Sequence, residues 1–371
     1  MLRVPQGRRD VVRKEDLENR PRGILHGDGV PGGIAIRIDA VERGYANAMS
    51  NVSKNRVSTR VARARRRAAA CAVLLVLLPF AAAAADIQVF TVAKGLPSNW
   101  VTALAAAPDG KLWVGTGNAG VYLLDPATGR GKGYRASDGL ASDEVTSIAL
   151  FGEKVYVGTV SGLSVFDEGK WSATEKIGNV TMRNVRLAAS PDGKALWACS
   201  VYLAGGTVRF DGKEWEFMGG KGRGLFNDIQ GFAFLPGGVA MGSGSGVPYL
   251  HTGGDVKALS EGLPPGNIFA VAAEGKILFL GSSRGLFEYD GKWKEVPLPA
   301  GFGGASVFAV AARDGEVVIG SDKGLVKARP GKPQALTEGT GLPASRVTAV
   351  AYTGALVAAG TARGLALVGK W

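Results

Sequence analysis

The sequence predicts an all-β fold: a seven-bladed β-propeller of four-stranded antiparallel blades, closed by an N-terminal outer strand in the last blade. Three observations support this prediction. A segment of about forty residues recurs seven times, each copy alternates short apolar runs with glycine-rich turns, and no window outside the N-terminal leader carries a helical stripe. Glycine supplies 56 of the 371 residues without a collagen-like period, which is typical of a chain with many tight turns.

Each copy contains an apolar run that ends in Gly-Thr or Gly-Ser. The glycines of these pairs are Gly115, Gly158, Gly242, Gly281, Gly320 and Gly360, and Ala198 takes that place in the third copy. A second glycine follows in every copy, at Gly120, Gly162, Gly206, Gly246, Gly285, Gly324 and Gly364. This regular spacing predicts that the copies are units of one repeated structure.

The first copy shows the elements expected of a blade. Residues 101–105 form the innermost strand, Asp109-Gly110 a hairpin turn, and residues 111–114 and 120–124 the next two strands. Residues 87–91 resemble the outer strand that other copies carry near their ends, whereas the seventh copy runs out at Trp371. We therefore expect residues 87–91 to complete the last blade and to leave no long sheet edge open.

The N-terminal segment reads as a leader. A basic block ends at Arg67, residues 68–80 are apolar, and a small-residue run ends at Ala85. These are the three regions of a secretory signal peptide, with cleavage after Ala85. The alternative is a single membrane anchor, but the strongly apolar part is shorter than the ~20 residues that cross a bilayer. Met49 is a sensible start, so residues 1–48 are interpreted as a mis-annotated or disordered extension, 49–85 as the signal peptide and 86–371 as the propeller.

Most of the positive charge lies in this leader. The chain has 44 Lys and Arg against 32 Asp and Glu, but residues 1–67 alone carry 16 of the basic and 7 of the acidic residues. Nucleic-acid binding needs a basic footprint on the folded domain. The sequence therefore argues against a nucleic-acid partner.

Few residues are suited to metal binding or to histidine chemistry. Only Cys199 and His251 of the two cysteines and two histidines follow residue 85. A thiolate zinc site is thereby excluded, and we expect neither a metal nor a cofactor. His251 runs into a loop-like segment with no nucleophile motif beside it, so we expect a surface residue in preference to a general base.

The first copy resembles the two-component regulator propeller repeat. The resemblance rests on Gly-Leu-Pro-Ser-Asn-Trp-Val-Thr at residues 95–102, Asp-Gly-Lys-Leu-Trp-Val-Gly-Thr at 109–116, and Gly120-Val121. It extends over residues 86–371, more loosely in the third and fourth copies. It implies a propeller like those in periplasmic sensor halves of bacterial hybrid kinases and in some stand-alone secreted proteins. Since no kinase segment follows the repeats, a signalling role would require a separate partner protein.

Two further patterns have a structural interpretation. Residues 115–120 match the dinucleotide fingerprint G-x-G-x-x-G, but a strand and a turn follow where the fingerprint needs a helix. Trp171, Trp215, Trp293 and Trp371 recur at one repeat position, which favours packing between or at the edges of blades over a ligand platform.

The loops at one end of the blades are the preferred place for a binding site. The loop that leads into the innermost strand and the loop between the second and third strands emerge on the same face, around the channel. We expect this channel rim to bind a ligand or partner through Trp100, Asn118, Glu144, Asn184, Tyr202, Asp228, Asn267, Arg284, Lys323, Arg346 and Arg363. The alternative is that these residues are ordinary solvated side chains of surface loops. Basic residues from blades five to seven, and the acidic residues Asp143 and Glu144 from blade two and Asp228 from blade four, would give the rim a charge gradient.

These patterns indicate a non-enzymatic, periplasmic or secreted binding module. The expected partner is a small polar ligand or an envelope protein, including a separate sensor kinase, and the expected form is a monomer without a membrane span after cleavage. Two alternatives stay open: a periplasmic propeller enzyme, either a lyase or a hydrolase, and a scaffold in a cell-envelope assembly.

Overall fold

The computed structural model describes residues 86–201, 205–218 and 228–369. Over these residues the chain forms seven four-stranded antiparallel sheets and one two-stranded hairpin, which confirms the predicted fold class. Every described residue belongs to one compact unit, Ala81–Trp371. The interpretations of residues 1–48 and 49–85 lie outside the described residues and stay predictions.

Each blade is a meander in which consecutive strands pair. The innermost strands are β2 (Val101–Ala106), β6 (Val145–Phe151), β12 (Val185–Ala189), β16 (Ile229–Leu235), β20 (Ile268–Glu274), β24 (Val307–Arg313) and β28 (Val347–Thr353). The second strands are β3 (Leu112–Thr116), β7 (Lys154–Thr159), β13 (Leu196–Ser200), β17 (Gly238–Ser243), β21 (Ile277–Ser282), β25 (Glu316–Ser321) and β29 (Leu356–Thr361). The third strands are β4 (Val121–Asp125), β8 (Leu163–Asp167), β14 (Thr207–Phe210), β18 (Pro248–Thr252), β22 (Gly285–Tyr289), β26 (Leu325–Arg329) and β30 (Gly364–Val368).

The outer strands complete the blades. They are β5 (Arg130–Tyr134), β9 (Lys170–Thr174), β15 (Trp215–Phe217), β19 (Asp255–Ala258), β23 (Trp293–Glu295), β27 (Gln334–Leu336) and, for the seventh blade, β1 (Ile87–Phe90). The short elements between blades are the hairpin strands β10 (Lys176–Ile177) and β11 (Val180–Thr181) and the 3₁₀ turns η2 (Val92–Lys94), η3 (Ala136–Asp138) and η4 (Glu338–Thr340). In the described part of the chain, no helix is long and apolar enough to cross a membrane.

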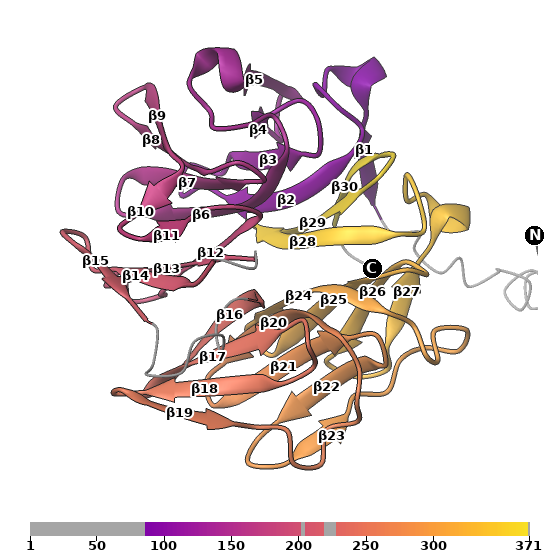
Figure 1. Ribbon diagram of the computed structural model, residues 1–371. Helices are drawn as coiled ribbons and strands as arrows, with labels where there is room; N and C mark the ends of the chain where they lie inside the picture. Colours follow the sequence, from indigo (N-terminus) through magenta and orange to yellow (C-terminus); the bar gives the residue numbers. More distant parts are fainter. Residues whose placement is uncertain (1–85, 202–204, 219–227, 370–371) are drawn as a thin grey trace, which may run out of the picture. The chain divides into compact units, whose positions relative to one another are not determined.

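The blades of this unit form a closed ring. Each innermost strand contacts the innermost strand of the next blade, and β28 of the seventh blade contacts β2 of the first. The strand β1 pairs antiparallel with β30, with Phe90 opposite Leu365, so the first strand of the unit lies beside the last (indigo and yellow in Figure 1). The predicted closure by residues 87–91 is confirmed.

A glycine in the second strand of every blade except the third sets the distance between neighbouring blades. A Cβ added to Gly115 would lie 2.5 Å from Cγ1 of Val145, the first residue of the next innermost strand. The same close approach recurs around the ring, including the junction between blades seven and one, where a Cβ on Gly360 would lie 2.6 Å from Cγ1 of Val101. Backbones can approach this closely only where no side chain intervenes. The repeated Gly-Thr and Gly-Ser pairs are therefore a packing requirement between blades.

The third blade departs from this rule, and one sequence assignment was wrong. Ser200 donates its backbone N–H to the carbonyl of Gly206, as Thr116 does to Gly120, so the residue before Ser200 is the counterpart of Gly115. That residue is Cys199, not Ala198. The thiol of Cys199 is buried in a cluster with Ile229, the first residue of the next innermost strand.

The glycine of the Gly-Leu motif has a different role. Gly95, Gly139 and Gly341 end the turns η2, η3 and η4 with φ values of 96°, 109° and 112°, a conformation that favours glycine. Asn99 and Asp143 steady the first two turns, because each side-chain oxygen accepts the N–H of the first turn residue at 2.7 Å. Asp143, which contributed to the predicted charge gradient, thus has a structural partner.

The core lies between adjacent blades. One cluster joins Phe90 and Leu365 of the seventh blade to Leu112 and Leu124 of the first, and comparable clusters occupy the other interfaces. The recurring tryptophans pack toward the outer ends of blades: Trp171 contacts Trp113, Trp215 stacks on Phe210, and Trp293 donates its indole N–H to the carbonyl of Leu259. Their predicted packing role is confirmed, whereas Trp371 lies outside the described residues.

Candidate functional site

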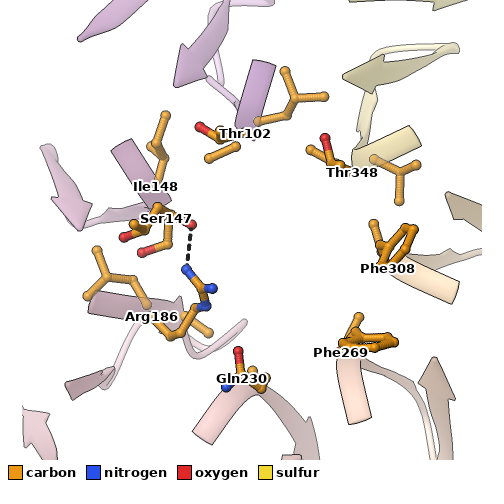
Figure 2. A pocket seen from close by; sticks show the side chains of 18 of the residues that line it. Thr102, Ser147, Ile148, Arg186, Gln230, Phe269, Phe308 and Thr348 are labelled. Atoms are coloured by element: carbon orange, nitrogen blue, oxygen red, sulfur yellow. Dashed lines mark hydrogen bonds between the residues drawn. The ribbon is translucent and has the colours of Figure 1, made fainter. Parts of the chain in front are cut away.

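A cavity of about 510 Å³ opens at the centre of the ring. Its walls are the innermost strands, and the second residue of every innermost strand lines it. Figure 2 labels Thr102, Arg186, Gln230, Phe269, Phe308 and Thr348 among them. We call these residues the channel ring: Thr102, Thr146, Arg186, Gln230, Phe269, Phe308 and Thr348. Apolar side chains, including Leu104, Ile148 and Val310, line the next tier along the channel.

β-bulges aim most of the ring residues at the channel. In β2, Val101 pairs with Thr116 and Ala103 with Gly115, which leaves Thr102 as the extra residue between them. The same shift occurs in the innermost strands of blades two, four, five, six and seven. A bulge bends the strand and redirects a side chain. The strand β12 keeps a regular register instead, with Arg186 opposite Cys199.

Three ring residues connect neighbouring blades. The hydroxyl of Thr102 donates to the carbonyl of Val145 at 2.7 Å, that of Thr146 to Val185 at 2.6 Å, and that of Thr348 to Val101 at 3.0 Å. Each acceptor is the first residue of the next innermost strand. Threonine at this position, in blades seven, one and two, therefore stabilises the fold.

Blades three to six carry other side chains at the same position. Arg186, Gln230, Phe269 and Phe308 replace the threonine there, and each is half-buried at the channel wall. In Figure 2 the guanidinium of Arg186 points into the channel from one side, and the two phenylalanine rings lie across from it. We call these four residues the variable arc.

Arg186 brings a positive charge into the cavity. Its Nη1 donates to the carbonyl of Thr146 at 3.1 Å, the dashed bond in Figure 2, and no carboxylate of the described residues forms an ion pair with it. Burial lowers the pKa of Arg186 from its ordinary value, but a guanidinium stays charged in proteins. Gln230, the next residue of the arc, donates from Nε2 to Oδ1 of Asp228 at 2.8 Å.

The other side of the arc is aromatic. The rings of Phe269 and Phe308 lie 5.3 Å apart, and the guanidinium of Arg346 lies 4.4 Å from the centre of the Phe308 ring. Trp100 also lines the cavity, with 49% of its surface exposed. Its ring lies against Gly117, where an added Cβ would come within 2.4 Å of it.

The two predicted sets of loops do meet at one rim. The backbone N–H of Gly117 donates to Trp100, and corresponding bonds join Val160 to Glu144, Gly244 to Asp228, Ser283 to Asn267 and Asp322 to Ser306. The predicted residues Asn118, Glu144, Asn184, Asn267, Arg284, Arg346 and Arg363 are exposed, and Asp228 and Lys323 are half-buried. Tyr202 lies outside the described residues.

Most of the predicted rim residues do not face the cavity. Of those that the structure describes, Trp100 alone lines it. Three basic residues contact their own blades: Arg284 donates to the carbonyl of Pro265, Lys323 to those of Gly301 and Gly303, and Arg363 pairs with Glu338. Arg346 is the basic rim residue that leans over a residue of the channel ring.

Sequence reasoning missed the variable arc by two positions. Each of its residues, Arg186, Gln230, Phe269 and Phe308, lies two residues after a position at the rim, respectively Asn184, Asp228, Asn267 and Ser306. A signal was present, because the first residue of each innermost strand is Val or Ile in all seven copies whereas the second varies.

Two other sequence features lie elsewhere. His251 is on β18, the third strand of its blade, where its ring contacts Trp197 at a centroid distance of 5.5 Å. It is not among the described residues that line the cavity. Residues 115–120 connect two strands of one blade, as expected from the lack of a helix signal.

Comparison with known proteins agrees with the repeat and with the fold. The two component regulator propeller family matches residues 95–118. No curated protein sequence matches the chain. The extracellular domains of the putative hybrid two component systems BT3049 and BT4673 from B. thetaiotaomicron superpose with TM-scores of 0.60 and 0.59, each at 15% identity. The alignments cover 76% of this chain but only 41% and 39% of those domains.

An enzyme shares the architecture. A catalytically inactive virginiamycin B lyase from Staphylococcus aureus, solved with quinupristin, superposes with a TM-score of 0.62 over 77% of this chain and 100% of its own, at 9% identity. Identities this low establish the fold and leave function open. The sheet topology identifies the chain as a seven-bladed β-propeller, and its residues 95–118 match the two component regulator propeller family.

Proposed function

We propose that this propeller is a non-enzymatic recognition module that binds a small ligand at the channel ring. The observation that carries the proposal is the variable arc. At this position, three blades carry a threonine whose hydroxyl donates a hydrogen bond to the next blade. Four consecutive blades lack that threonine and place Arg186, Gln230, Phe269 and Phe308 around the cavity instead. Cavities of about 300–1,000 Å³ with a few convergent polar groups are typical of ligand sites.

The test restores threonine to the arc. A variant with Arg186→Thr, Gln230→Thr, Phe269→Thr and Phe308→Thr carries at every ring position the residue that three blades already use. We expect it to fold, because threonine fits that position in its neighbours. A matched control places threonine at four exposed outer-strand positions, with Lys132→Thr, Ser172→Thr, Glu216→Thr and Lys257→Thr.

The measurement is the melting temperature with benzoate, phenyl phosphate, benzylamine or glucose. A ligand that binds the folded state raises the melting temperature in proportion to RT ln(1 + [L]/Kd). At least one compound should stabilise the wild type and the control but not the arc variant. Equal shifts in all three proteins, or no shift in the wild type, would contradict a ligand site in the channel.

The proposed location is the periplasm or the cell exterior. The leader-like segment before Asp86 and the extracellular setting of the two similar sensor domains support it. Expression of the full chain in a Gram-negative host should give a periplasmic product whose first residue is Asp86. Edman sequencing of the purified product, or its intact mass, checks the cleavage, and a cytoplasmic product that keeps residues 49–85 would contradict it.

We also propose that a separate signalling protein binds the exposed rim. The similarity to sensor domains supports a signalling role, and the rim presents exposed polar loops around the cavity mouth. A photo-cross-linking residue at Asn118, with a second at Ser172 on an outer strand as control, tests this in cells. A histidine kinase captured from Asn118 alone supports the proposal, and capture of only other protein classes contradicts it.

A further inference from the structure

We propose that the ligand of the channel ring is a small aromatic carboxylate, with its carboxylate at Arg186 and its ring against Phe269 and Phe308. This inference rests on the proposed function and specifies its ligand class. Its basis is the division of the variable arc into a cationic side and an aromatic side that face each other across the cavity (Figure 2).

Arg186 has the donors that a carboxylate needs. A guanidinium presents five N–H donors, and in the described structure one of its nitrogens, Nη1, donates to a protein acceptor, the carbonyl of Thr146. That bond fixes the side chain and leaves the other donors directed at the cavity. A planar carboxylate can accept two parallel N–H bonds from such a fork.

The acidic residue nearest to the arc in sequence, Asp228, is hydrogen-bonded to Gln230. Asp228 precedes Gln230 at the rim, and its Oδ1 accepts the N–H of the Gln230 amide at 2.8 Å. Glu144, the other predicted acidic rim residue, is exposed and does not line the cavity among the described residues. Asp228 does not line the cavity either, and neither carboxylate forms an ion pair with Arg186 in the described structure, so the charge that lines the cavity is the positive charge of Arg186.

The aromatic side fits a flat apolar group. Phe269 and Phe308 are half-buried at the wall, 5.3 Å apart between ring centres, and the tier beyond them carries Val271 and Val310. Aromatic rings pair in offset or edge-to-face geometry at such distances, which a bound ring can extend.

A cationic ligand fits less well. The faces of the two phenylalanines could attract a cation, but Arg346 already covers Phe308 at 4.4 Å and Arg186 lies across the channel. A second cation would meet repulsion from both. A neutral sugar can place a C–H face against the two phenylalanines, but it offers no charge to Arg186, which favours a ligand that has both an apolar face and a carboxylate.

The experiment compares benzoate with three relatives by isothermal titration calorimetry on the full chain. Benzamide keeps the ring and loses the charge, acetate keeps the charge and loses the ring, and phenyl phosphate exchanges the carboxylate. We expect benzoate to bind at least about tenfold more tightly than benzamide or acetate, because the charge-assisted bond and the ring contact are each lost in one relative. Tighter binding of phenyl phosphate than of benzoate would overturn the carboxylate assignment.

Variants at Arg186 assign the contact. Arg186→Gln should weaken benzoate about tenfold or more and leave benzamide nearly unchanged, whereas Arg186→Lys should retain part of the benzoate affinity. Arg130→Gln, at an exposed position of the outer strand β5, is the matched control. Circular dichroism and melting establish that each variant is folded, and equal benzoate affinity in wild type and a folded Arg186→Gln variant would overturn the inference.

Failure of this inference differs from failure of the proposed function. Suppose that glucose or benzylamine stabilises the wild type but not the four-threonine variant, and that benzoate stabilises neither protein. The channel is then a ligand site, and the assignment of an anionic ligand is wrong. If none of the probes distinguishes the wild type from that variant, the ligand site itself is wrong.

Discussion

Cys199 illustrates how burial between blades changes the chemistry of one side chain. Its thiol is buried beside Ile229, and this burial raises the pKa from 9.0 to about 11. An acid whose pKa is higher in the folded chain than in the unfolded chain favours folding while it is protonated. The contribution of Cys199 is therefore complete below pH 9 and is lost as the pH rises toward 11.

We predict that stability falls more steeply above pH 9 in the wild type than in Cys199→Ala. The difference should reach at most a few kcal/mol, since two pKa units separate the two states. Urea unfolding at pH 8, 9.5 and 10.5 measures it. Burial also raises the pKa of Tyr352, so both proteins should lose some stability in this range, and parallel curves would contradict the assignment to Cys199.

Two tryptophans at one repeat position differ in their hydrogen bonds. The indole N–H of Trp293 donates to the carbonyl of Leu259, whereas that of Trp171 is buried without a partner among the described residues. Leaving a buried carbonyl without its donor costs about 1–3 kcal/mol, whereas removing an unpaired donor carries no such cost. We therefore expect Trp293→Phe to destabilise the protein more than Trp171→Phe in chemical unfolding, and the reverse order would contradict these partners.

At the scale of the strand, the spacing of the blades depends on the absence of a side chain. A Cβ on Gly320 would lie 2.7 Å from Cγ1 and 2.8 Å from the carbonyl oxygen of Val347 in the next blade. Gly320→Ala should cost about 1–3 kcal/mol, the usual penalty for overpacking. Gly303→Ala is the control, because no atom lies within 4 Å of its added Cβ. Similar melting temperatures for the two variants would contradict the packing role.

The sequence made the strands and their order predictable because the same local requirements recur in every copy. A left-handed turn demands Gly95, Gly139 and Gly341, and close approach demands the glycines of the second strands. The assignment failed in the third copy, where Cys199 replaces the glycine and only Ser200 of the repeated pair is kept. The structure locates the position, because Ser200 pairs with Val185 as Thr116 pairs with Val101 and donates its N–H to Gly206.

The site was less predictable because the β-bulges decide which side chains face the channel. Residues of a strand alternate between faces, but the shift between Val101 and Ala103 turns Thr102 to the channel, and no residue type in the sequence specifies that shift. The contacts of the basic rim residues were hard to predict for another reason. Arg284, Lys323 and Arg363 find partners in their own blades, and long flexible side chains do not reveal their contacts by position alone.

At the scale of the ring, structural and variable positions divide the channel wall. Blades seven, one and two place Thr348, Thr102 and Thr146 at the wall and connect through them, and the same three blades include the closure by β1. Blades three to six supply the variable arc. The part of the ring that contains β1 and β30 is therefore hydrogen-bonded across its blades, and blades three to six provide the side chains proposed to bind ligand.

The ring also depends on β1, the outer strand of the seventh blade. Without it, β30 would present an unpaired edge whose five residues, Gly364–Val368, are all buried in the intact protein. An open apolar edge pairs readily with other chains. A chain that begins at Thr91 also loses Phe90, which is 3% exposed in the core between blades seven and one.

We predict that this truncated chain melts at a lower temperature and forms concentration-dependent oligomers, in contrast to a chain that begins at Asp86. Phe90→Ala alone should cost about 3–5 kcal/mol, the range for removing a buried aromatic side chain. Gln88→Ala, at an exposed position of the same strand, should have little effect. Light scattering after size-exclusion chromatography measures the oligomers, and a truncated chain that stays monomeric with an unchanged melting temperature would show that β1 is dispensable for closure.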